Sequence, residues 1–172
     1  MIARPLDGET ARRDNPRMFE VAPAAAPADL EQARILFREY AEQVDAPCCF
    51  ATFNDEVASL PGEYALPAGR LFLARRNGEA AGCVAMRRLD SSSGEMKRLY
   101  VRQPFRRDRL GRTLAKLVIT AAREQRYRRL VLDTLPKMQE AIALYKSLGF
   151  AERGPYSDEP TPGAIFFELT LS

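Results

Sequence analysis

The stretch Glu95-Met96-Lys97-Arg98-Leu99-Tyr100-Val101, with the turn Arg106-Arg107-Asp108-Arg109-Leu110-Gly111 that follows it, decides the fold of this chain. Its first part ends as a strand, and the turn opens directly into an apolar stripe at helical spacing. The first N–H groups of a helix lack intrahelical partners and sit at the positive end of its dipole, so they bind phosphate oxygens. The arginines add charge-assisted contacts. The stretch therefore predicts a strand, a pyrophosphate-binding turn and a helix, in that order.

Further elements follow on both sides of this stretch. We expect strands over residues 17–22, 70–76, 79–89, 95–101, 128–133, 150–154 and 164–171. Helices are expected from Pro27 to about Gln43, over 55–60 behind an Asn54 cap, from Leu110 to about Gln125, and from Pro136 to a stop at Gly149. The dipeptide Asn77-Gly78 predicts a tight hairpin.

The order of these elements predicts the fold class. A strand, helix and strand in succession imply parallel pairing of the fourth and fifth strands, whereas the hairpin makes the beginning of the sheet antiparallel. We expect an α/β fold with a mixed sheet of six or seven strands and helices on both faces. The length of 172 residues suits one domain over 17–172, after a polar leader over 1–16 that we expect to be flexible.

The composition excludes several classes of site. Histidine is absent, which rules out Ser-His-Asp and Cys-His mechanisms and removes the commonest transition-metal ligand, so we expect no metal. The cysteines Cys48, Cys49 and Cys83 show no metal or redox spacing and are interpreted as small apolar residues. No apolar run reaches the roughly 20 residues of a membrane span, and the first residues do not form a signal peptide. We expect a cytoplasmic protein.

The arginine turn carries a family resemblance. Val101 to Arg112 resembles the acetyl-CoA-binding motif of the GNAT superfamily of acyl-CoA-dependent N-acyltransferases, commonly Gln/Arg-x-x-Gly-x-Gly/Ala. Arg106 and Gly111 match the first and last positions, but Arg109 stands where the middle glycine is expected. Several helical backbone conformations suit arginine, so we expect the loop to bind with a slightly different geometry. The order of the elements and the later Tyr145 and Gly149-Phe150 strengthen the resemblance.

The resemblance implies how acetyl-CoA is held. It implies that strands four and five splay apart, with pantetheine in the gap pairing with the backbone of the fourth strand, where an N–H polarises the thioester carbonyl. Relatives often carry an asparagine near the start of the last helix, and Met138 takes that place here, where it packs on pantetheine or only on the core. The implied cofactor residues are Leu99, Tyr100, Val101, Arg106, Arg107, Asp108, Arg109, Leu110, Gly111, Arg112, Thr113 and Met138.

The resemblance also assigns the catalytic groups. Tyr145 occupies the position from which relatives protonate the departing sulfur, and a phenol with a pKa of about 10 carries a proton to give. A core tyrosine on the apolar helix face is the alternative. Glu95 takes the place of a general base, often acting through water, against a solvated acid beside Lys97 or Arg98. Asp133 is the reserve base, or a structural acceptor for backbone donors.

The leading hypothesis is an N-acetyltransferase that passes acetyl from acetyl-CoA to a primary amine of a small molecule by direct attack in a ternary complex. Acetylation of a protein amine and a non-catalytic acyl-CoA sensor are the alternatives. Nucleic-acid binding ranks last, because the net charge of +3 is small and only Phe105 and Tyr127 interleave with the basic residues. The connector Cys48 to Phe53 and the loop 156–163 are expected to meet the acceptor. Family habit suggests a homodimer through a sheet edge or a late strand.

Overall fold

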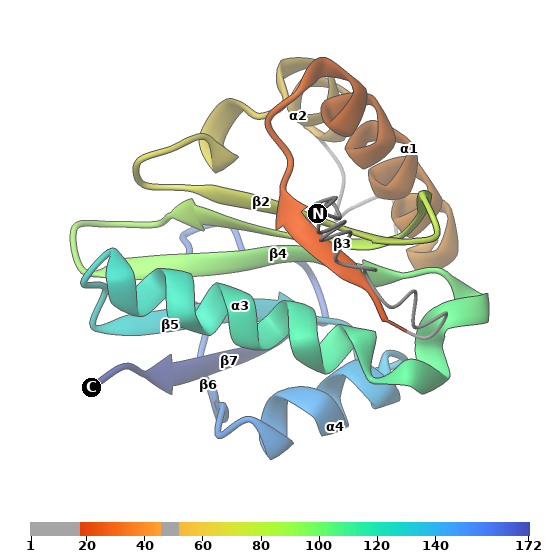
Figure 1. The fold of residues 1–172 in the computed structure, drawn as a ribbon. Helices are drawn as coiled ribbons and strands as arrows, with labels where there is room; N and C mark the ends of the chain where they lie inside the picture. Colours follow the sequence, from red (N-terminus) through yellow and green to blue (C-terminus); the bar gives the residue numbers. More distant parts are fainter. Residues whose placement is uncertain (1–17, 46–51) are drawn as a thin grey trace, which may run out of the picture.

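One mixed sheet of seven strands forms the centre of the molecule (Figure 1). The computed structural model describes residues 18–45 and 52–172. The strands are β1 (Glu20–Pro23), β2 (Arg70–Arg76), β3 (Glu79–Arg88), β4 (Ser93–Val101), β5 (Arg129–Thr134), β6 (Ala151–Arg153) and β7 (Ile165–Thr170). Their order across the sheet is β1-β2-β3-β4-β5-β7-β6, and every neighbouring pair is antiparallel except β4 and β5. The predicted mixed sheet with its parallel pair is confirmed.

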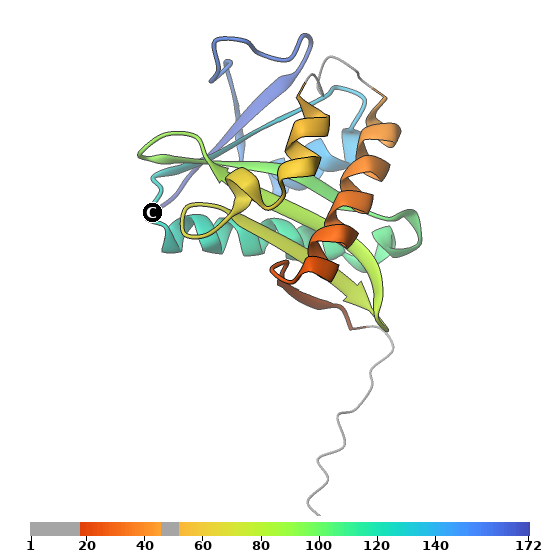
Figure 2. The ribbon, with the colours of Figure 1, turned by 90° about the horizontal axis from the view of Figure 1, so that it is seen from above.

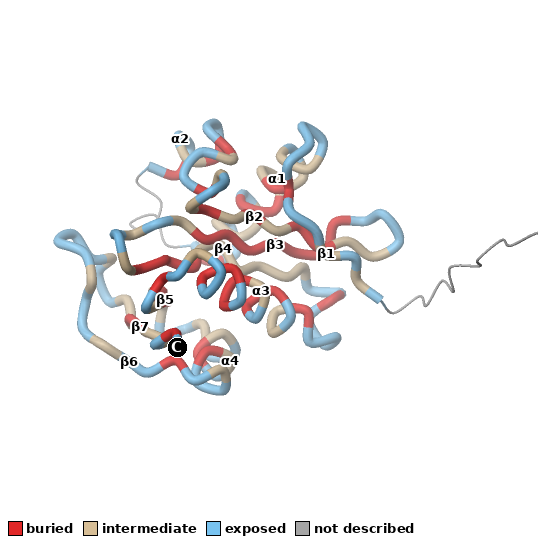
Figure 3. Tube along the Cα trace, turned by 60° about the vertical axis from the view of Figure 1, so that its left-hand side comes forward, coloured by how far each residue is buried: buried red, intermediate tan, exposed pale blue. Residues whose placement is uncertain are grey.

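Helices cover both faces of this sheet (Figures 1 and 2). They are α1 (Pro27–Val44), α2 (Phe53–Ser59), α3 (Leu110–Glu124) and α4 (Gln139–Ser147), with short 3₁₀ turns η2 (Gly62–Tyr64) and η3 (Gln103–Asp108). Leu36 and Phe37 of α1 pack with one core cluster, and Leu114 of α3 with Ile142 of α4 packs with the other. Figure 3 shows buried residues along the central strands and on the helix sides that face them. None of these helices is long and apolar enough to cross a membrane.

The strands β4 and β5 separate soon after they pair. Only Ser93–Glu95 pairs with Arg129–Val131, although β4 continues to Val101 and β5 to Thr134. On its other side β4 carries a bulge, because the register with β3 shifts between Cys83 and Ala85. Arg98 in this bulge has a φ of 56°. The implied splay between strands four and five is present, and it leaves one edge of β4 without a strand partner beyond Glu95.

The hairpin prediction is confirmed, whereas two predicted helix starts are wrong. Asn77 and Gly78 have φ values of 51° and 80°, both positive, as a type I′ turn requires. Asn54 is not a cap: Thr52 O already accepts from the Glu56 N–H at 3.1 Å, so Asn54 lies inside α2. Pro136 does not open α4, since the Met138 N–H donates to Leu135 O at 2.9 Å and closes a turn with proline at its second position.

Several strand ends also differ by a few residues from their predicted positions. β1 spans Glu20–Pro23, later than the predicted 17–22, and β4 begins at Ser93, ahead of Glu95. The ends of strands are set by pairing with distant neighbours, which local residue patterns do not record. The predicted leader over 1–16 and most of the acceptor connector, including Cys48 and Cys49, lie outside the described residues.

Candidate active site

A groove of about 810 Å³ lies along the end of β4, the start of α3 and one side of α4. Eight of the twelve predicted cofactor residues line it, and these eight come from β4, the arginine turn and the residue before α4. They are Leu99, Tyr100, Val101, Arg106, Arg109, Gly111, Arg112 and Met138. The structure thus brings together in one groove residues that are up to about forty positions apart in the sequence.

The other four predicted residues do not line this groove. Arg107 is exposed, and Asp108 pairs with Arg76 at 2.7 Å. The side chain of Leu110 is fully buried in the core beneath α3. The Thr113 N–H already donates to Arg109 O at 3.2 Å, so this amide, which was predicted to bind phosphate, is occupied within the protein.

The first turn of α3 presents free amides at one end of the groove. Thr113 makes the first intrahelical bond, so the N–H groups of Leu110, Gly111 and Arg112 precede it and have no intrahelical acceptor. Arg109 is the N-cap, with φ 58° and ψ 18°, in the left-handed region that favours glycine. A Cβ on Gly111 would approach Leu144 Cδ2 only to 3.7 Å. Packing within the protein therefore does not require this glycine, because a Cβ would make only ordinary contacts with Leu144 and Val101.

Cationic side chains surround these amides. Arg106 donates from Nε to Val101 O at 2.9 Å and from Nη2 to Gln43 Oε1 at 2.5 Å, and Arg112 donates to Ser147 Oγ at 2.5 Å. Lys137 also lines the groove and donates to the carbonyl of Val44. Sequence reasoning missed Lys137, whose only signal was its place between β5 and α4. Amides at a helix start and these cations together form a site suited to a polyphosphate.

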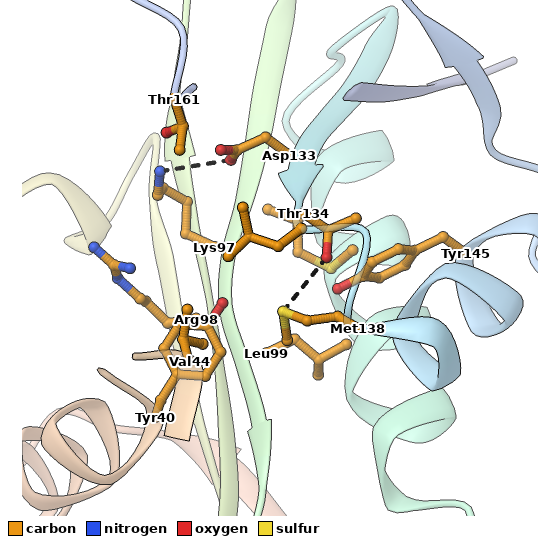
Figure 4. A pocket seen from close by; sticks show the side chains of 12 residues that line it. Tyr40, Val44, Lys97, Arg98, Leu99, Asp133, Thr134, Met138, Tyr145 and Thr161 are labelled. Atoms are coloured by element: carbon orange, nitrogen blue, oxygen red, sulfur yellow. Dashed lines mark hydrogen bonds and ion pairs between the residues drawn. The ribbon is translucent and has the colours of Figure 1, made fainter. Parts of the chain in front are cut away.

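A small cavity of about 60 Å³ adjoins the groove in the gap between β4 and β5 (Figure 4). The two spaces share four lining residues, namely Tyr40, Val44, Leu99 and Met138. The Thr134 hydroxyl lies 3.6 Å from Met138 Sδ, which fixes the methionine at the junction of the two spaces. A chain-like ligand that enters along the groove would therefore end at this cavity.

Tyr145 presents its hydroxyl to the cavity (Figure 4). Its ring comes from α4, is only 7% exposed, and packs against Phe150 and Phe167 with centroid distances of 5.9 and 6.2 Å. Burial, and then the nearby Tyr40 and Asp133, raise the pKa of this phenol. The hydroxyl therefore stays protonated at neutral pH. The ring packs in the core and the residue also lines the cavity, so its role as the acid stays a prediction.

Glu95 lies deeper, next to the cavity but not on its lining. Its side chain is 3% exposed, and it accepts from Arg87 Nε at 2.5 Å, Tyr156 Oη at 2.9 Å and Lys97 Nζ at 3.4 Å. Burial raises the pKa of Glu95, but Lys97 and Arg87 outweigh it and hold the pKa below its usual range. The expected alternative of a solvated acid is wrong, because the carboxylate is buried and ion-paired.

Asp133 reaches the cavity lining from the end of β5. Its carboxylate lies 4.0 Å from Lys97 Nζ and 3.4 Å from the Tyr156 hydroxyl (Figure 4 shows the Lys97 contact). Tyr156 is a further residue that sequence reasoning did not single out, since it was named only as the start of the late loop. The Tyr156 hydroxyl thus contacts both Glu95, near the start of β4, and Asp133, near the end of β5.

A metal centre is not formed by the residues that the structure places. Within 18–45 and 52–172 no three His, Cys, Asp or Glu side chains come together as metal ligands. Cys83 is fully buried in β3, and burial raises the pKa of its thiol. This cysteine fits its interpretation as a small apolar residue.

Comparisons with known proteins agree with this geometry. The acetyltransferase (GNAT) family matches residues 30–150. An uncharacterized N-acetyltransferase of Schizosaccharomyces pombe is 35% identical, over 91% of this chain and 98% of its own. The crystal structure of an acetyltransferase from Streptococcus agalactiae has a TM-score of 0.76 at 20% identity, covering 89% of this chain and 98% of its own. A Salmonella typhimurium protein solved with its cofactor acetyl-CoA has a TM-score of 0.69 at 18% identity, covering 90% and 95%.

Proposed function

The chain belongs to the GNAT family of acetyltransferases and is an N-acetyltransferase, and we propose that it transfers acetyl from acetyl-CoA to a primary amine of a small molecule. The proposal includes direct attack within a ternary complex. The observation that carries it is that the groove shares four lining residues with the cavity that Tyr145 lines. One end of this path suits a polyphosphate, and the other holds a proton donor.

The residues of the groove fit coenzyme A in three parts. The amides of Leu110, Gly111 and Arg112, with the guanidinium groups of Arg106 and Arg109, would hold the pyrophosphate. The edge of β4 over residues 99–101 has no strand partner and offers backbone groups to the amides of pantetheine, with the carbonyl of Val101 already accepting from Arg106. Met138 supplies an apolar contact at the turn toward the cavity.

The chemistry needs a proton for the leaving thiolate. Tyr145 supplies it from a phenol that its surroundings keep neutral. A backbone N–H at the β4 edge polarises the thioester carbonyl, which favours attack by a neutral amine. The amine of the acceptor would reach the thioester in the cavity of about 60 Å³ that Tyr145 lines.

The test measures the release of CoA thiol from acetyl-CoA with a panel of free amino acids, polyamines, aromatic amines and short peptides. Tyr145→Phe should lower kcat by about 10²- to 10⁴-fold while acetyl-CoA still binds in calorimetry. Tyr127→Phe is the matched control, because Tyr127 is equally buried but bonds Ala68 O away from the cavity. Full turnover by Tyr145→Phe contradicts the acid role. Preference for peptides over every small amine contradicts a small acceptor.

A further inference from the structure

We infer that Asp133 is the carboxylate that takes the proton from the acceptor amine, and that Tyr156, anchored by Glu95, positions it. This inference rests on the proposed transfer to an amine. An ammonium group cannot attack a thioester until it loses a proton, so the site needs an acceptor for that proton within reach of the cavity. The candidates are Glu95, near the start of β4, and Asp133, near the end of β5.

Access separates the two acids. Asp133 is the one carboxylate among the residues that line the cavity. Glu95 is almost fully buried behind it, and both of its oxygens are occupied: Oε2 accepts from Arg87, and Oε1 accepts from Tyr156 and lies 3.4 Å from Lys97 Nζ. A carboxylate that is held by two cations and a phenol, and that does not reach the cavity, is poorly placed to meet the amine.

Tyr156 joins the two acids through a single hydroxyl. Its oxygen lies 2.9 Å from Glu95 Oε1 and 3.4 Å from Asp133 Oδ1. The phenol has one proton, which it donates to Glu95 at the shorter distance, and its oxygen is left to accept from Asp133 once that carboxyl is protonated. Edge-to-face packing on Phe166, with a centroid distance of 5.5 Å, fixes the ring. Burial and the two acids raise the pKa of Tyr156, so this proton stays in place.

The cations that contact Glu95 differ from those that contact Asp133. Lys97 from β4 faces both carboxylates. Arg87 from β3 pairs with Glu95 and Glu63. Tyr145 from α4 faces Asp133 with a neutral phenol. Glu95 is therefore the acid that stays charged, consistent with its lowered pKa. Among the described residues Asp133 pairs with one cation, Lys97, at 4.0 Å, so no close ion pair holds its carboxylate.

The proton balance closes with these residues. Asp133 takes one proton from the ammonium, and the freed lone pair forms the N–C bond to the thioester carbonyl as the C–S bond breaks. Tyr145 gives its proton to the sulfur and regains one from the new amide nitrogen. Asp133 then releases its proton to solvent. The products are an N-substituted acetamide, CoA thiol and one proton, as the overall transfer requires.

The experiment compares Asp133→Asn, Tyr156→Phe and Glu95→Gln with the control Glu124→Gln, an exposed acid at the far end of α3. With the amine that the panel identifies, Asp133→Asn should lower kcat by at least about 100-fold without changing the KM for acetyl-CoA. Its log kcat should rise by one per pH unit through the range in which the wild type levels off. Added formate should restore part of the activity of Asp133→Ala.

Positioning residues should behave differently. Tyr156→Phe and Glu95→Gln should keep a plateau in the pH profile but shift its midpoint, with kcat lower by about tenfold. A plateau in Asp133→Asn with kcat within threefold of the wild type overturns the inference. Loss of the plateau in Glu95→Gln alone assigns the base to Glu95 instead. If the wild type releases no CoA with any amine, the proposed function itself fails. If the wild type is active and Asp133→Asn is unaffected, only the assignment of Asp133 as the base is overturned.

Discussion

Replacing Arg109 with glycine should stabilise the folded protein and weaken acetyl-CoA binding. One substitution should thus have opposite effects on stability and on affinity. Arg109 is the N-cap of α3 in the left-handed conformation, where the family motif has glycine. Its side chain lines the groove, so it combines a backbone strain with a charge near the proposed pyrophosphate.

The magnitudes follow from this conformation. An L-residue in the left-handed conformation costs about 1–2 kcal/mol, which glycine would relieve. Glycine has greater freedom in the unfolded chain, and this offsets about 0.5–1 kcal/mol of the stabilisation. Arg109→Gly should therefore raise the free energy of unfolding by about 0.5–1 kcal/mol, and the Tm by about 2–4 °C for each kcal/mol. Loss of a charge-assisted contact worth about 1.5–3 kcal/mol weakens binding by about 10- to 150-fold.

The assay pairs Arg109→Gly with Arg109→Ala, which loses the same charge but keeps a Cβ in the left-handed region. Urea unfolding gives the stability of each variant without ligand, and calorimetry gives its Kd for acetyl-CoA at low salt. We expect the glycine variant to be more stable than the alanine variant by about 1 kcal/mol. Equal stability refutes the strain argument, and a wild-type Kd in Arg109→Ala refutes a phosphate contact by Arg109.

Three further predictions test other parts of the molecule. Gly111→Ala should raise the free energy of unfolding by about 0.5–1 kcal/mol, since alanine favours helix and its Cβ meets only ordinary contacts. The same variant should bind acetyl-CoA more weakly. Unchanged affinity in calorimetry contradicts the proposed close approach of phosphate. Glu56→Gln should cost about 3 kcal/mol in urea unfolding, because it removes the charged partner of Arg98, whose side chain is 8% exposed. Burial raises the pKa of Glu56, but Arg98 holds it below 4.5. The contribution of Glu56 to the free energy of unfolding is therefore complete above that pH and declines in acid. If Glu56→Gln keeps the pH dependence of stability of the wild type, this argument is contradicted. The raised pKa of Tyr145 predicts that kcat does not fall through ionisation of this phenol up to pH 10. A fall in kcat with rising pH that is present in the wild type and absent in Tyr145→Phe would count against this prediction.

The sequence predicted the elements of the fold well because their patterns are local. The stripe of α3 identified residues that are buried, among them Leu114 and Val118, and Asn77-Gly78 located the hairpin. The errors at Asn54 and Pro136 arose where one residue suits both a helix start and a turn. The bulge of β4 had no local signal, since Arg98 adopts a positive φ without being glycine or asparagine.

The site was predictable where it follows the chain and not where it depends on packing between strands. Gly111, Arg106 and Arg109 lie within one turn, so a motif could identify them together. The contact between Glu95 and Tyr156 joins residues 61 positions apart. No periodicity in one segment indicates which side chains from a distant loop will enter the gap between two strands.

The separation of β4 and β5 explains why binding and chemistry meet at one place. Where two parallel strands part, the backbone of each loses its hydrogen-bond partners, and buried unpaired groups are costly. In the gap, Lys97 Nζ of β4 lies 4.0 Å from the Asp133 carboxylate of β5. Further along, the edge of β4 can pair with the amides of a ligand. In the proposed function, the same break in the sheet thus offers backbone partners to pantetheine and brings the end of that chain to Asp133.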